Sequence, residues 1–92
     1  MTDAYKRDLD RCPANFQPLT PLSFLARSAD VFPEKTAIIH GRDRHDYASF
    51  FARSRRLASA LERAGVRHGQ TVSALLPNTP PMLEAHYGVA MM

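Results

Sequence analysis

The sequence predicts an α/β fold, and three patterns support that prediction. Residues 48–64 repeat apolar side chains at helical spacing, so that one face of a long helix is apolar. Residues 71–76 form a small and apolar run, which suits a strand covered on both faces, as in parallel sheets. A further helix follows, and in such folds a helix carries the chain to the next parallel strand. We expect, in order, a helix, a β-hairpin, an amphipathic helix, a buried strand and a helix, with an incomplete sheet.

A helix start is marked near residue 20, after a polar stretch over residues 1–18 that we expect to be an extended arm. Thr20 can cap the helix, and Pro21 fits its first position, where a missing N–H costs nothing. Leu19 and Phe24 occupy the two positions of a hydrophobic staple. Pro33 disfavours helical geometry in the residue before it, so the helix should end between residues 30 and 32.

A hairpin and the long helix follow. Residues 35–40 are rich in β-branched and apolar side chains, residues 41–44 form a polar turn, and residues 45–47 are predicted to be extended. Asp46 offers a carboxylate to the free N–H groups of the helix that follows. The expected core face of that helix lies within an arc of about 140° and consists of apolar residues and one serine: Phe50, Phe51, Ser54, Leu57, Ala58, Leu61 and Ala64. Gly65 supplies its C-terminal cap.

The last helix is predicted to begin at Thr79, Pro80 and Pro81 and to run to the end of the chain. Its expected apolar face consists of Met82, Leu83, His86, Val89 and Ala90. We interpret His86 as a packed, hydrogen-bonded histidine. Gly88 costs about 1 kcal/mol inside a helix, so we expect another element to approach closely there.

Composition is that of an ordinary globular chain, with 45% hydrophobic and 23% charged residues. Five of the first ten residues are charged, and no apolar stretch approaches the roughly 18 residues that a membrane span needs, so the expected compartment is the cytoplasm. Cys12 is the sole cysteine, which excludes an intramolecular disulfide. A core built from 92 residues should be marginal.

The net charge of +3 is concentrated in residues 41–70, which hold seven arginines. A nucleic-acid-binding face would need clustered basic residues. On the predicted helix, however, Arg55 and Arg56 project in different directions, and no aromatic residue lies between the arginines to stack on bases. We therefore favour a solvated surface, although a small basic nucleic-acid binder remains an alternative that would use Arg53, Arg55, Arg56, Arg63 and Arg67.

Residue types that act in catalysis or in ligand binding do not form a recognisable motif in this sequence. The four glycines are scattered singly, so no phosphate-binding loop is predicted. The histidines at 40, 45, 68 and 86 lack the spacing and the partners of a zinc site. We expect no catalytic residue, no cofactor-binding residue and no metal ligand in this chain.

Five stretches nevertheless resemble the N-terminal start of the AMP-forming acyl-CoA synthetases, which belong to the adenylate-forming superfamily: residues 15–25, 31–37, 46–50, 55–61 and 76–89. The opening Leu19-Thr-Pro-Leu-Ser-Phe-Leu25 and the turn Pro77-Asn-Thr-Pro80 are most similar to the short- and medium-chain acyl-activating branch. Ala90 departs from the family pattern, in which a proline is common at that position.

The resemblance implies that residues 19–92 are the N-terminal part of the large domain of an AMP-dependent synthetase and ligase. Such a parent would join a carboxylic or fatty acid to CoA with ATP, releasing AMP and pyrophosphate, and would use ATP, Mg²⁺ and CoA. The family's phosphate loop, nucleotide-binding motifs and catalytic lysine come later in its chains. We therefore expect a truncated piece that is inactive alone.

Two kinds of partner are compatible with these observations. One is the missing remainder of the parent domain. The other is a protein that covers Met82, Leu83 and Val89, which would make the chain a stand-alone interaction module.

Overall fold

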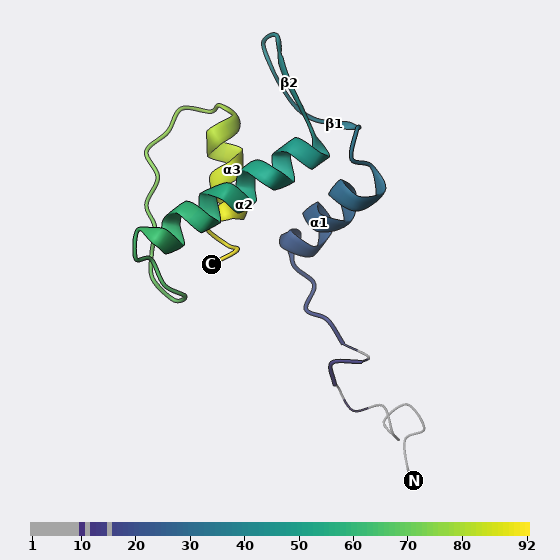
Figure 1. Cartoon of the computed structure of the whole chain (residues 1–92), viewed down its shortest axis with the longest axis vertical. Helices are drawn as coiled ribbons and strands as arrows, with labels where there is room; N and C mark the ends of the chain where they lie inside the picture. Colours follow the sequence, from purple (N-terminus) through teal and green to yellow (C-terminus); the bar gives the residue numbers. More distant parts are fainter. Residues whose placement is uncertain (1–9, 11, 15) are drawn as a thin grey trace.

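The α/β class is confirmed by the computed structural model, which describes residues 10, 12–14 and 16–92. Three helices and one two-stranded sheet follow one another along the chain (Figure 1): α1 (Pro21–Val31), β1 (Thr36–His40), β2 (Asp43–Asp46), α2 (Tyr47–Arg63) and α3 (Pro80–Gly88). Helix α2 is the central element, because α1, the hairpin and α3 all pack against it. Most of the arm predicted over residues 1–18 lies outside the described residues.

Helix α1 begins as predicted. The Thr20 hydroxyl accepts a hydrogen bond from the Ser23 backbone N–H at 3.4 Å, and Pro21 occupies the first turn. The helix ends at Val31, before Pro33. The predicted staple does not shield its two side chains, since Leu19 is 84% exposed and Phe24 is 53% exposed. Leu25 is the residue of α1 that is buried.

The hairpin is antiparallel, and its register places Ile38 opposite His45 and His40 opposite Asp43. The pairing register shifts between Thr36 and Ile38, at the end of the hairpin away from the turn. Strand β2 begins two residues earlier than predicted, because the turn at Gly41 and Arg42 is tighter than the four-residue turn expected from the polar residues.

Both ends of α2 follow their predicted signals. The Asp46 carboxylate accepts a hydrogen bond from the Ser49 N–H at 2.8 Å. At the other end Gly65 has a φ of 97°, and the N–H groups of Gly65 and Val66 donate to the carbonyls of Glu62 and Leu61. These two bonds form a Schellman cap, whose left-handed residue is most often glycine.

The strand predicted over residues 71–76 is not formed. The segment has no regular secondary structure and passes outside the helices as a wide connection between α2 and α3 (Figure 1). A strand is stabilised by hydrogen bonds to a neighbouring strand, and the described residues provide no neighbour beside this segment. Residues 71–76 thus have the composition expected of a strand, but they pair with no other strand among the described residues.

Helix α3 begins at Pro80 as predicted, and ends at Gly88 rather than at the end of the chain. Its expected buried face was wrong. Pro80, Glu84 and Gly88 are buried, whereas Leu83 and His86 are exposed. Of the apolar stripe identified by spacing, Leu83, His86 and Ala90 are exposed. The side of α3 that packs on α2 instead carries the buried Glu84 and Gly88.

The core is small, as expected. Among the described residues the buried hydrophobic side chains are Leu25, Ile38 and Phe50, one each from α1, β1 and α2. The Phe50 ring meets the Tyr87 ring edge-on, with 5.2 Å between centroids, which ties α3 to this cluster. A core of this size leaves large apolar side chains exposed.

Candidate functional site

Catalytic or metal-binding groups do not gather in the part of the chain that the structure describes. No set of three His, Cys, Asp or Glu side chains there could hold a metal ion. Within the same residues every buried side-chain nitrogen or oxygen has a hydrogen-bond partner.

The histidines are dispersed. His40 and His45 lie on the hairpin, and His68 lies in the connection after α2, where its Nδ1 is 3.1 Å from the Met92 carbonyl oxygen. His86 is hydrogen-bonded as predicted, but the prediction that it is packed was wrong. Its ring is exposed, and Nδ1 lies 2.8 Å from the carbonyl oxygen of Met82, one turn earlier.

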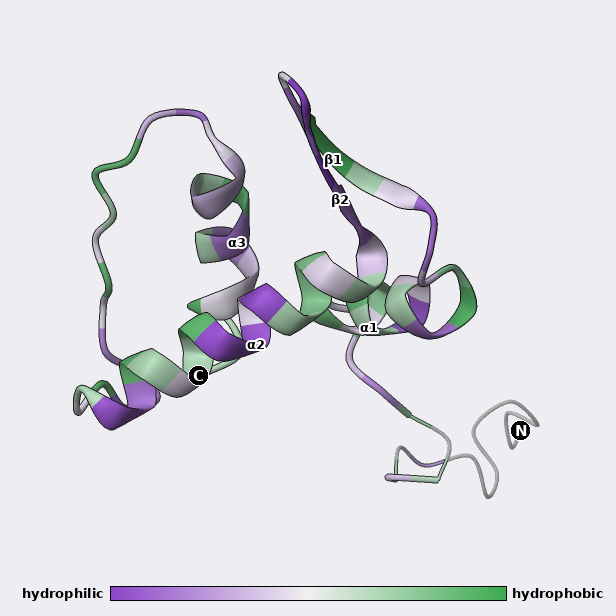
Figure 2. Ribbon diagram, turned by 45° about the horizontal axis from the view of Figure 1, so that its top comes forward, coloured by the Kyte–Doolittle hydropathy of each residue, from purple (hydrophilic) through white to green (hydrophobic). Residues whose placement is uncertain are grey.

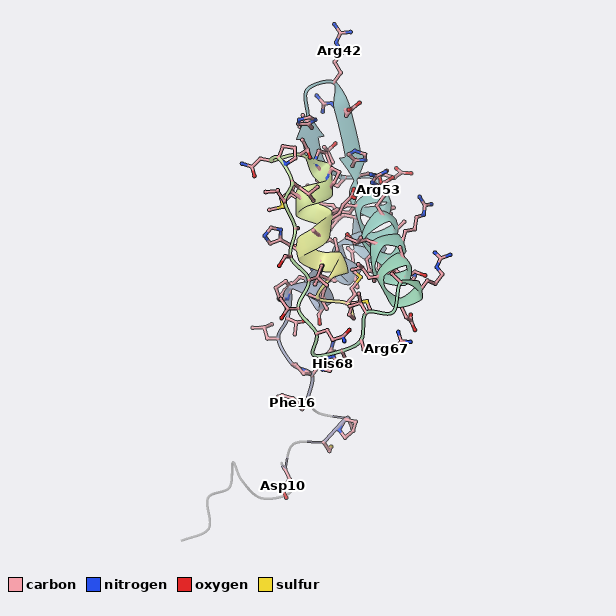
Figure 3. All side chains as sticks on the ribbon, turned by 90° about the vertical axis from the view of Figure 1, so that its left-hand side faces the viewer. Asp10, Phe16, Arg42, Arg53, Arg67 and His68 are labelled. Atoms are coloured by element: carbon pink, nitrogen blue, oxygen red, sulfur yellow. The ribbon has the colours of Figure 1, made fainter. Side chains whose placement is uncertain are left out.

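The arginines do not form one basic face. Arg42 lies at the tip of the hairpin, and Arg67 lies near the opposite end of the folded part (Figure 3). On α2, the guanidinium of Arg55 lies 5.6 Å from the centre of the Phe51 ring. Arg67 donates to the backbone carbonyls of Glu62 and Val66, both at 3.2 Å. Several of these side chains thus have partners within the chain.

Arg53 was assigned from sequence to the solvated face, but it forms an ion pair with Glu84. The Arg53 Nε donates to the Glu84 carboxylate across the contact between α2 and α3. The Glu84 side chain is only 9% exposed, whereas that of Arg53 is 42% exposed. One sequence signal could have revealed this pair. Glu84 is the only charged residue after Arg67, and a charged side chain among apolar neighbours is rarely buried without a partner.

Gly88 confirms its predicted role at the same contact. A Cβ atom at this position would lie 2.8 Å from Leu57 Cδ2 and 2.9 Å from the Ser54 carbonyl oxygen. Ser54 is fully buried, and its hydroxyl donates to the Phe50 carbonyl oxygen at 2.9 Å. Glycine therefore lets α3 approach α2 closely, one turn beyond the ion pair.

A groove of about 510 Å³ lies between the hairpin and α3. It is lined mainly by apolar side chains, together with two histidines and the residues that open α3: Ile38, Ile39, His40, Asn78, Thr79, Pro80, Met82, Leu83 and His86. Ile39 and Leu83 are exposed large hydrophobic residues in its wall. In Figure 2 part of β1 is coloured as hydrophobic, whereas β2 beside it is hydrophilic.

A second apolar feature is the connection between α2 and α3. Val72, Ala74 and Leu76 line a crevice of about 200 Å³ against both helices, while Leu75 is fully exposed. Residues 71–76 form part of the wide loop between α2 and α3 in Figure 2, and Thr71 and Ser73 are the polar residues among them. The partner surface predicted from sequence is divided, because Met82 and Leu83 line the groove whereas Val89 lines this crevice.

The groove and the connection carry exposed apolar side chains, among them Ile39, Leu75 and Leu83. Exposed apolar residues grouped in this way are typical of surfaces that another polypeptide covers. In the described part of the chain, no helix has the length and apolar character needed to cross a bilayer.

Comparison with known proteins gives one family match. A sequence model of the family described as AMP-binding enzyme matches residues 25–92. No solved structure matches the chain.

Curated relatives cover most of this chain. It is 46% identical over 84 residues to the peroxisomal acetate/butyrate–CoA ligase of Arabidopsis thaliana, and 42% identical over 88 residues to an acetate–CoA ligase of Humulus lupulus. It is 39% identical over 84 residues to the peroxisomal benzoate–CoA ligase of Arabidopsis thaliana. These matches span 91%, 92% and 91% of this chain, but only 15%, 16% and 14% of the respective relatives.

Proposed function

Because the chain belongs to the family of AMP-binding enzymes, we propose that it is the N-terminal structural part of an ATP-dependent acyl-CoA ligase. The observation that carries this proposal is 46% identity to a ligase over nine-tenths of the chain. The parent would convert a carboxylic acid, ATP and CoA into acyl-CoA, AMP and pyrophosphate. The 92 residues would supply packing surface, and the reacting groups would come from the rest of the parent.

Carboxylic acids are the substrate class we propose for that parent, with a role in fatty acid metabolism. The names of the three relatives specify acetate or butyrate, acetate, and benzoate. These names describe those proteins, and they favour the short- and medium-chain branch for this one. ATP, Mg²⁺ and CoA would bind to the parent outside the residues described above.

The test uses the purified chain. We expect that it neither exchanges pyrophosphate into ATP nor forms acyl-CoA from acetate, butyrate or benzoate. The Arabidopsis acetate/butyrate–CoA ligase, assayed in parallel, controls for the substrates. Turnover by the pure chain that follows the protein through chromatography would overturn the proposal.

The groove between the hairpin and α3 supports a second function. In this proposal the chain is a stand-alone module, and a partner protein docks over Met82 and Leu83. The observation that favours it is the exposure of Leu83, which is 46% exposed in the wall of the groove. A tagged chain would retain the same protein from cell extract when native, and lose it after Leu83→Lys. Nucleic acid is not a partner that we propose, because the arginines are dispersed; salt-dependent DNA or RNA binding would contradict this.

For the compartment we propose the cytoplasm, on the basis of an overall composition with 23% charged residues. Two of the relatives named above are peroxisomal by name. A fluorescent fusion imaged with a peroxisomal marker distinguishes the two locations.

A further inference from the structure

We draw no further inference here: the strongest candidate, the apolar groove between the hairpin and α3, carries none because nothing in the structure shows what covers it.

Discussion

Glu84 and Arg53 join α3 to α2 through a pair whose members differ in their access to water. The carboxylate is buried, whereas the guanidinium reaches solvent. Removing the exposed partner leaves a buried charge without compensation, whereas neutralising the buried partner leaves an arginine that water can still solvate. Substitution of Arg53 and substitution of Glu84 should therefore lower the free energy of unfolding by different amounts.

We expect Arg53→Met to lower the free energy of unfolding by about 1–3 kcal/mol, because the buried Glu84 carboxylate loses its partner. Glu84→Gln keeps the shape of the side chain and should cost less, about 1 kcal/mol. Urea unfolding followed by circular dichroism measures both values. A larger loss for Glu84→Gln than for Arg53→Met would contradict this account of the pair.

Gly88 provides a second residue-scale test. Alanine is the better helix former by about 1 kcal/mol, but its Cβ would meet Leu57 and the Ser54 carbonyl at less than 3 Å. Overpacking of this kind typically costs about 1–3 kcal/mol, so Gly88→Ala should be destabilising despite its helix propensity. A stabilised variant in the same urea experiment would show that the helices do not approach as closely as described. Combining Gly88→Ala with Leu57→Ala should cost less than the two separate losses added together.

At the scale of elements, the boundaries of α1, β1 and α2 could be predicted because their signals are local. A cap is a contact between residues a few positions apart, as between Asp46 and Ser49, and the Schellman cap needs only Gly65 and its neighbours. The same reasoning failed for residues 71–76, because pairing of a strand depends on a distant segment that local sequence does not specify. It failed for the buried face of α3 because spacing shows which residues are apolar, but not which side meets α2.

The residues that line the groove between the hairpin and α3 could likewise be predicted only in part. Met82, Leu83 and Val89 were predicted to lie on one surface, but only Met82 and Leu83 line the groove, whereas Val89 lines the crevice beside the connection. Ile39 was not predicted, because its place in the groove depends on how the hairpin is set against α3. The buried Glu84 was also missed, since helical spacing alone assigned the opposite face to the core.

The cap of α2 gives a prediction for this scale. Asp46→Ala removes the side-chain acceptor for the Ser49 N–H, and loss of an N-cap costs about 1 kcal/mol. Asp43→Ala, at an exposed position in β2, is the matched control and should change stability by less than about 0.5 kcal/mol. Equal effects of the two substitutions would mean that the cap does not stabilise α2.

At the scale of the whole molecule, the described residues bury few apolar side chains and leave several exposed. Leu25, Ile38 and Phe50 form the buried cluster, whereas Ile39, Leu75 and Leu83 are exposed. The chain spans about 15% of the length of the first relative named above. A small core and an uncovered apolar surface are what a structural part of a larger ligase would have when it stands by itself.

The central claim is tested most directly by a chimera. In the Arabidopsis acetate/butyrate–CoA ligase, the 84 matched residues would be replaced by the corresponding residues of this chain, and acetyl-CoA formation would be measured. We predict an active ligase, and a much weaker one when the same chimera carries Gly88→Leu, which prevents α3 from approaching α2. A chimera that folds with a native melting transition but forms no acyl-CoA would contradict the claim.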